Sequence, residues 1–246
     1  MPFDLSPEAS VALALALLGA AFVRGYSGFG FSAIFIAFSA LLVNPLPLIP
    51  VVFACEVLMT VFQARGIRGH VDWARVLPLL LGAAIALPFS VSFMLSVDSE
   101  TVRLTVAAIV LVMALILLSG WTLQRHIKAP GHTGVGFISG LCNAAGIGGL
   151  PVAAFMTAQP MAAPAFRATM IVYLTGLDLI TMPFLWHGGL VTSETAIAAA
   201  MAFPLLGIGI FFAGRRFGAA SPEGFRTFAI ALLLILAILG LIRPLL

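Results

Sequence analysis

Residues 25–32 of the chain read GYSGFGFS and lie between two strongly apolar runs, directly after Arg24. Three glycines and two serines in eight residues are typical of a surface turn, yet both flanking runs have the composition of membrane-spanning helices. Backbone that leaves a helix at membrane depth must be buried in protein or line a wet cavity, because lipid cannot hydrogen-bond its free amides. The stretch therefore predicts a break between two helices inside the bilayer.

The composition places the whole chain in a membrane. Of its 246 residues, 62% are hydrophobic and 9% are charged, and the mean hydropathy is +1.17. A soluble domain carries about 25% charged residues, so we expect an all-α polytopic membrane protein. The net charge of +3 is then no sign of nucleic-acid binding. The first ten residues, MPFDLSPEAS, hold no Lys or Arg, so we expect the first segment not to be a cleaved signal.

Apolar runs of about 20 residues mark helices that cross the membrane. Six such runs lie at residues 46–64, 76–95, 102–118, 165–186, 195–213 and 225–241. Two further regions, 9–43 and 133–161, each hold a pair of shorter apolar stretches joined by a glycine cluster. Each pair is either two thin crossings, which gives ten crossing helices in all, or a re-entrant hairpin, which gives six.

The two glycine clusters occupy matching places in two halves of the chain. The second cluster reads NAAGIGGLP at residues 143–151, and adding 118 to Gly28 and Gly30 gives Gly146 and Gly148. An E-x-x-R motif also opens the last apolar run of each half. An internal repeat is a main sequence signature of secondary-transporter folds. We therefore predict two transmembrane repeats of about five helices each, residues 1–120 and 131–246, joined by a cytoplasmic linker at 121–130.

The basic residues indicate how the chain is oriented, because cytoplasmic loops collect Lys and Arg. Basic loops alternate with loops that carry none: the N-terminal tail, the 96–100 turn and the 187–194 loop hold no Lys or Arg. This pattern predicts that the two repeats are inverted and that both termini are periplasmic. The basic loops contain Arg65, Arg68, Arg75, Arg125, Lys128, Arg215 and Arg216.

The helix breaks are candidate anion-binding sites. A break creates a new helix N-terminus, whose free amides and partial positive charge attract anions, and glycine lets an anion approach the backbone closely. We expect the second helix of each pair to begin near Ser27 and near Gly146, at the middle of the bilayer. The alternative is that the glycines serve close packing of helices. The candidate substrate-binding residues are Arg24, Ser27, Gly28, Gly30, Ser32, Asn143, Gly146, Gly148, Gly149 and Arg167.

Four ionisable side chains lie inside the apolar segments: Arg24, Glu56, Arg167 and Asp178. Such residues are costly in a membrane core and mark functional sites by default. The two acids lie in mid-helix, and we predict that one of them couples transport to protons. Glu56 is the preferred residue and Asp178 the second candidate. The alternative is structural pairing of Arg24 with Glu56 or of Arg167 with Asp178. The His and Cys residues show no metal-ligand spacing, so no metal and no cofactor are expected.

These features together resemble the sulfite exporter TauE/SafE family. The resemblance covers essentially the whole chain and lies in the inverted repeat, the G-x-G cluster after the first apolar run and the stretch GFISGLCNAAGIGGLP at 136–151, which is similar to that family's glycine-rich motif. It implies a secondary transporter of the bacterial inner membrane that carries a small anion, typically sulfite or a sulfonate such as sulfoacetate. The first cluster departs from the motif because it lacks the GG pair.

The sequence thus predicts a transporter rather than an enzyme. A small anion would bind at the midplane between the two clusters, and the halves would rock to expose it alternately to each side, in the export direction. The alternative is an intramembrane enzyme resembling a lipid-pyrophosphate phosphatase with re-entrant hairpins; an anion channel is a third interpretation. The expected partners are the anion, protons and membrane lipid. The oligomeric state stays open, with a homodimer as one alternative.

Overall fold

The described part of the chain is helical throughout. The computed structural model describes residue 3 and residues 5–123, 127–216 and 222–242, and this part holds no strand. The first half contains α1 (Pro7–Ser27), α2 (Phe31–Leu42), α3 (Ile49–Ile67), α4 (Trp73–Ser96) and α5 (Ser99–Leu118), with a short 3-10 turn at Leu46–Leu48. The second half contains α6 (Ala129–Asn143), α7 (Gly149–Thr157), α8 (Ala163–His187), α9 (Ser193–Arg216) and α10 (Pro222–Ile242).

Local sequence signals begin several of these helices. The Ser6 hydroxyl accepts a hydrogen bond from the Ala9 amide at 3.2 Å, and Pro7 occupies the first position of α1, where its missing N–H costs nothing. Asp98 caps α5 by accepting from the amide of Thr101 at 2.9 Å. That amide and the Thr101 hydroxyl hold the pKa of Asp98 below its ordinary value. Capping residues thus mark where the chain leaves the membrane-spanning region.

The chain is a multi-pass membrane protein. Six helical segments of the described chain are long and apolar enough to cross a bilayer: Pro7–Ser27, Leu46–Ile67, Trp73–Ser96, Ser99–Leu118, Ala163–His187 and Ser193–Ala213. Helix α4 shows how such a segment meets lipid. Its outer face is a ladder of large apolar side chains, each more than half exposed, whereas Leu79, Ala83 and Leu87 on its inner face are fully buried. The outer ladder consists of Leu77, Leu81, Ile85, Phe89 and Phe93.

The helices beside the glycine clusters differ in length from the sequence-based expectation. Helix α1 has 21 residues and rises about 31 Å at 1.5 Å per residue, enough for the roughly 30 Å hydrocarbon core, although two short stretches were expected in residues 9–43. Its uninterrupted Ala- and Leu-rich run explains this length. Helices α2, α6 and α7 have 12, 15 and 9 residues, and all three rise less than about 23 Å. They are too short to cross an unthinned bilayer.

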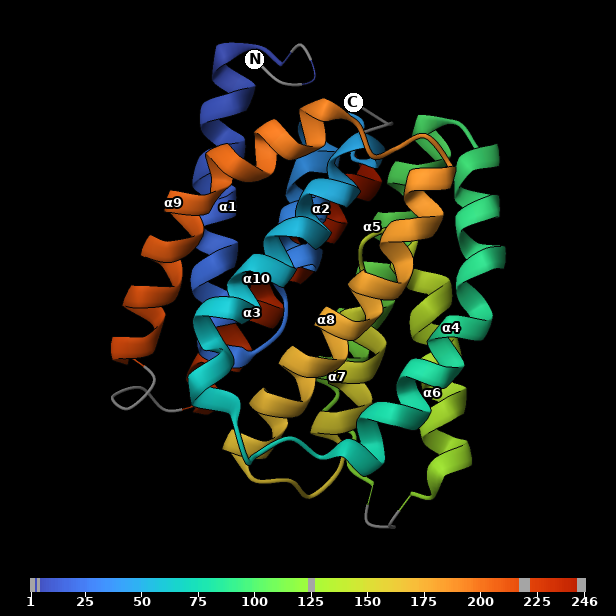
Figure 1. Ribbon diagram of the computed structural model, residues 1–246, viewed down its shortest axis with the longest axis vertical. Helices are drawn as coiled ribbons and strands as arrows, with labels where there is room; N and C mark the ends of the chain where they lie inside the picture. The colour runs from blue at the N-terminus through green and yellow to red at the C-terminus, as the bar shows by residue number, and fades with distance from the viewer. Residues whose placement is uncertain (1–2, 4, 124–126, 217–221, 243–246) are drawn as a thin grey trace.

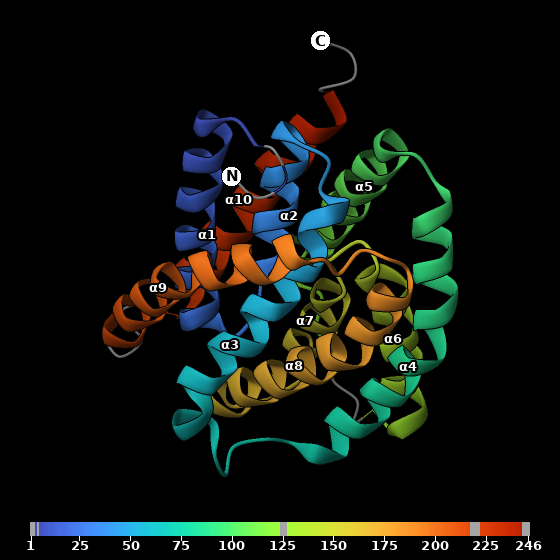
Figure 2. The same cartoon turned by 45° about the horizontal axis from the view of Figure 1, so that its top comes forward.

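Helices from the two halves interleave (Figures 1 and 2). Helices α1 and α9 pack together on one side of the molecule, and α4 and α6 pack together on the other. Between these pairs α3 lies against α8, so the middle of the molecule is built from one helix of each half. Helix α5 packs on α10. Any group carried by the inner faces of α3 and α8 therefore lies near the centre of the protein.

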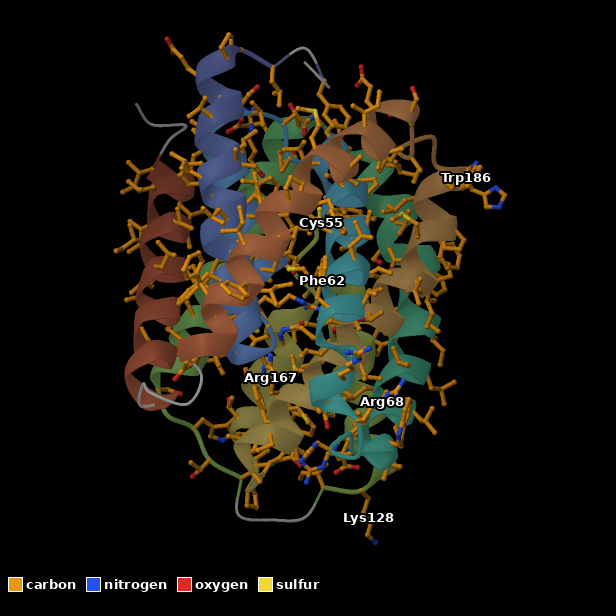
Figure 3. All side chains as sticks on the ribbon, turned by 60° about the vertical axis from the view of Figure 1, so that its left-hand side comes forward. Cys55, Phe62, Arg68, Lys128, Arg167 and Trp186 are labelled. Carbon is orange, nitrogen blue, oxygen red and sulfur yellow. The ribbon has the colours of Figure 1, made fainter. Side chains whose placement is uncertain are left out.

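The connections divide between the two ends of the bundle. In Figure 1 the start of α1, the α4–α5 turn and the α8–α9 connection lie at the upper end, and the α3–α4 connection lies at the lower end. Figure 3 places Arg68 and Lys128 at the lower end, far from Trp186. Arg68 and Lys128 thus lie at the same end of the bundle, as the loop pattern predicts.

Glycines bring α4 and α6 into backbone contact. A side chain on Gly82 of α4 would run into the backbone of Thr133, and one on Gly136 of α6 would run into the backbone of Leu79. Gly140, one turn after Gly136, meets α4 in the same way. This spacing is the G-x-x-x-G pattern that lets membrane helices approach closely. Packing glycines are therefore part of this fold, away from the two clusters.

The same kind of contact joins α1 to α9. A Cβ on Gly25 would lie 2.6 Å from that of Ala213, and a Cβ on Gly209 would lie 2.8 Å from that of Ala21. Real Cβ atoms do not come this close, so both positions need glycine. Each outer pair of helices is therefore held by small residues and close backbone contact.

We predict that Gly136→Val destabilises the fold by about 1–3 kcal/mol or more, because an overpacked interface must shift. Gly134→Val is the matched control: it adds the same side chain to the same helix at a position with nothing within 4 Å. The thermal unfolding temperature of the detergent-purified protein measures the effect. Equal temperatures for the two variants would contradict the close α4–α6 contact.

Candidate functional site

A buried ion pair lies where α1 meets α3. Arg24, in the last turn of α1, has 0% exposure, and Glu56, in the middle of α3, has 1%. The Nη1 atom of Arg24 lies 3.2 Å from Oε1 of Glu56. Of the two structural pairings considered from sequence, this one is present. A buried pair costs much desolvation energy, and removing one partner leaves an uncompensated charge.

A second acid joins this pair from α8. Asp178 is 1% exposed, and its carboxyl group lies near that of Glu56. Two acids thus share the surroundings of one buried arginine. Arg24, Glu56 and Asp178 form one charge cluster, contributed by α1, α3 and α8.

Two threonines complete the polar surroundings of the charge cluster. The Nη2 atom of Arg24 donates to the Thr60 hydroxyl at 3.4 Å, and the hydroxyls of Thr60 and Thr175 lie 2.6 Å apart. They connect α3 to α8 beside the charges. Sequence reasoning did not select Thr60. The available signal was its position four residues after Glu56, which places both side chains on one face of the helix.

The charge cluster has hydrogen-bonding capacity that the protein leaves unused. The Nε and Nη1 atoms of Arg24 are buried and make no hydrogen bond, although Nη1 is in the ion pair. Oε1 of Glu56 and Oδ2 of Asp178 are also buried without a hydrogen-bond partner. Buried polar atoms are normally satisfied, and an unsatisfied charged group is costly. Nε of Arg24 thus has no acceptor, and the contact of Nη1 is the ion pair with Glu56.

Arg167 fastens the start of α8 to the end of α1. Its Nε and Nη2 atoms donate to the carbonyl oxygen of Gly25 at 3.2 and 2.8 Å. That oxygen is one of the last four carbonyls of α1, which have no partner within the helix. The structural pairing of Arg167 with Asp178 is not formed. The two residues lie eleven positions apart on one helix, about 16 Å along its axis, which is beyond the reach of an ion pair.

The first glycine cluster ends α1 and starts α2. Gly28 has φ 84° and Gly30 has φ 91°, left-handed conformations that other residues rarely adopt. Helix α2 begins at Phe31, so the expectation of a start near Ser27 is wrong. Ser27 still belongs to α1, where its hydroxyl lies 2.8 Å from the carbonyl oxygen of Val23. The new N-terminus therefore lies four residues later, and Ser32 is buried in its first turn.

The second glycine cluster separates α6 from α7. Gly146, with φ 74°, lies in the connection, and α7 begins at Gly149 rather than near Gly146. Asn143, the last residue of α6, donates from Nδ2 to the Thr181 hydroxyl of α8 at 2.9 Å. The carbonyl of Gly148 accepts from the Ser139 hydroxyl. Both ends of this break are therefore held by side-chain hydrogen bonds.

Protein atoms occupy the space beside most of the cluster glycines. A Cβ on Gly28 would lie 2.9 Å from the carbonyl oxygen of Arg167, and one on Gly146 would lie 3.0 Å from Ile36. Gly148 and Gly149 are equally close to side chains of their neighbours. At Gly30 the nearest atom is 3.4 Å away, which is ordinary contact. These glycines therefore have a packing role, and Arg24 is a stronger candidate than they are for contacting an anion.

The arrangement is that of a multi-pass membrane protein with a buried, partly unsatisfied charge cluster beside a helix break. The sequence model of one family, described as sulfite exporter TauE/SafE, matches residues 13–240. The chain belongs to the sulfite exporter TauE/SafE family, as its resemblance predicted. The family comprises membrane exporters of sulfite and related anions, and its members are transporters rather than enzymes. Comparisons with curated proteins and with solved structures find no match to this chain.

Proposed function

We propose that the protein is a secondary transporter that exports a small sulfur oxyanion, such as sulfite or a sulfonate like sulfoacetate. The observation that carries this proposal is the fully buried Arg24, whose Nε and Nη1 atoms make no hydrogen bond. A guanidinium group offers N–H donors in a planar fork that matches the oxygens of an oxyanion. An anion in contact with these donors would satisfy them and compensate the positive charge.

The place of Arg24 beside a helix break supports a midplane site. Arg24 lies one turn before Gly28, and α2 begins only seven residues after it, at Phe31. The free amides at the start of α2 add partial positive charge to this region. The proposed anion therefore lies between the guanidinium group and the first turn of α2. Ser32, Gly28 and Gly30 are the nearby cluster residues. Arg167 contributes by holding the end of α1 in place.

Alternating access rests on the proposal that residues 1–120 and 131–246 are inverted repeats. The helix contacts support it, because they come in matching sets when α1–α5 are superposed in order on α6–α10. The α4–α6 contact corresponds to α9–α1, the α4–α8 contact corresponds to α9–α3, and α3–α8 and α5–α10 correspond to themselves. In such transporters one repeat rocks against the other around a fixed central site.

Individual residues follow the same symmetry. A side chain on Gly28 would meet Arg167, near the start of α8, and one on Gly146 would come within 3.6 Å of Ile49, at the start of α3. The two contacts are equivalent under the repeat, because Gly28 matches Gly146 and Ile49 matches Arg167 at the same spacing of 118 residues. The second cluster, with Asn143, Gly148 and Gly149, would therefore be the symmetry-related counterpart of the first. In our proposal it forms the opposite wall of the anion path.

The proposed orientation puts the linker at 121–130 in the cytoplasm of a bacterium and both termini in the periplasm, across the inner membrane. It is supported by the basic residues at one end of the bundle (Figure 3). We predict that a cysteine at the exposed Lys128 reacts with a membrane-impermeant maleimide only from the cytoplasmic side, and a cysteine at the exposed Glu8 only from the periplasmic side. Labelling of both from one side would contradict the inverted arrangement.

The composition of the charge cluster supports coupling to protons. Without an anion, Glu56 pairs with Arg24, and Asp178 is the second buried acid beside them. In our proposal an anion that binds Arg24 competes with Glu56, and the displaced carboxylate takes up a proton because a lone buried charge is costly. Transport of one anion would thus be linked to one proton. The groups that face Glu56 are Arg24 from α1, Asp178 from α8 and the Thr60 hydroxyl from its own helix.

For the binding site, we predict that Arg24→Ala abolishes sulfite binding and that Arg24→Lys weakens it at least tenfold, because lysine lacks the planar fork. Sulfite-dependent stabilisation in a thermal-shift titration of purified protein measures this, since a ligand of the folded state raises its stability by mass action. Arg103→Ala is the control: Arg103 also pairs with an acid, Glu100, but at the surface. Unchanged affinity in Arg24→Ala would mean that the arginine is only a structural partner.

For coupling, we predict that Glu56→Gln still binds sulfite, and more tightly, because Arg24 is released from its competing carboxylate. Its transport in proteoliposomes should no longer respond to a pH gradient. Asp178→Asn tests the second acid in the same assay, and the exposed Glu100→Gln is the control. A pH response of Glu56→Gln equal to that of the wild type would exclude Glu56 as the coupling residue.

A further inference from the structure

Gln63 is a buried amide without partners. It lies on α3 and is 5% exposed, and neither Nε2 nor Oε1 makes a hydrogen bond. Gln159 is a useful comparison within the same chain. It is also buried, at 7% exposure, but its Nε2 donates to the carbonyl oxygen of Phe155 at 3.2 Å. Burying an amide without any hydrogen bond costs a few kcal/mol, so Gln63 needs an explanation that Gln159 does not.

The position of Gln63 relates it to the charge cluster. Glu56, Thr60 and Gln63 are spaced four and three residues apart, so they follow one face of α3. On that face Glu56 pairs with Arg24, and Thr60 contacts both Arg24 and α8. Gln63 lies less than one turn beyond Thr60 and about 10 Å along the axis from Glu56. Its amide is therefore the next polar group after the charge cluster along this face.

An apolar contact closes the face beyond Gln63. Ile67, one turn further along α3, packs with Ala168 and Ile171 of α8, and all three are buried. Figure 3 shows Phe62 on α3 between Cys55 and Arg68. Arg68 and Lys128 lie at the same end of the bundle, which we call the basic end. Gln63 follows Phe62 in the chain, so it lies on the side of the charge cluster that leads to the basic end. Gln63 is thus placed between the charge cluster and the apolar contact that separates it from the basic end.

We propose that Gln63 is a further ligand of the transported oxyanion. Its Nε2 donates to an anion oxygen on the basic-end side of Arg24, and its Oε1 accepts from a hydrogen carried by the anion or by water. This inference rests on the proposed function. It explains why an amide with both a donor and an acceptor lies unpaired where an apolar residue would pack at lower cost. Arg24 supplies the charge, and Gln63 supplies neutral hydrogen bonds on the path to the basic end.

The test is sulfite binding by the purified full-length protein, measured by isothermal titration and by thermal shift. We expect Gln63→Leu to weaken sulfite binding about tenfold, which corresponds to about 1.4 kcal/mol. Its unfolding temperature without sulfite should equal or exceed that of the wild type, because the unpaired amide is gone. Gln159→Leu is the matched control: it should lower the unfolding temperature, since a paired amide is lost, and leave sulfite affinity unchanged.

The other outcomes separate the two levels of the proposal. Unchanged sulfite affinity in Gln63→Leu, together with loss of binding in Arg24→Ala, overturns the role of Gln63 and leaves the site at Arg24. Unchanged affinity in both variants overturns the proposed function itself. If the leucine variant does not yield folded protein, Gln63→Met provides the same comparison, because it keeps the length of glutamine without its amide.

Discussion

The ion pair between Arg24 and Glu56 is the constraint on which the rest of the structure depends. In a membrane interior water is not there to compensate a charge, so both groups must be enclosed by protein and held close together. This requirement determines which helices are central. Helix α1 delivers the arginine, α3 delivers the acid, and α8 adds Asp178 and Thr175. The lipid-facing side of α4 carries no comparable charged group: it exposes large apolar side chains and two serines, Ser92 and Ser96, which donate to carbonyl oxygens of their own helix.

Glycine has two distinct roles around this constraint. At Gly28 and Gly30 the positive φ angles end α1 soon after Arg24, so the guanidinium group lies at a helix end rather than in the middle of a continuous helix. At Gly82 and Gly136 the missing side chain lets two backbones touch. Gly28 combines both roles, because it adopts a positive φ and also lies against Arg167. The outer helix pairs are therefore joined by close backbone contact, whereas α3 and α8 meet through a hydroxyl contact and the apolar contact of Ile67.

The sequence predicted the class of fold because hydropathy has a strong signal in a membrane protein. The runs at 76–95, 102–118, 165–186 and 195–213 each lie within an observed helix, and the run at 46–64 covers the 3-10 turn and most of α3. The buried charges were also recognisable, since few residues in such runs are ionisable. The exact helix starts were not, because Gly28 and Gly146 are compatible with several turn geometries. Thr60 and Gln63 were missed for another reason. Isolated polar residues in a helix gain meaning only when the opposing helix is known, and no local pattern identifies α8 as the neighbour of α3.

The apolar contact of Ile67 with Ala168 and Ile171 has a consequence for energy conservation. A transporter whose titratable groups were wetted from both sides at once would short-circuit the proton gradient, since protons pass readily along chains of water. Here Glu56 and Asp178 are each 1% exposed, and the face of α3 that leads from them to the basic end finishes in buried branched and small side chains. Under the proposed coupling, this apolar contact would keep a continuous file of water from the carboxyl pair. The resting protein would then be insulated against proton leak at that end.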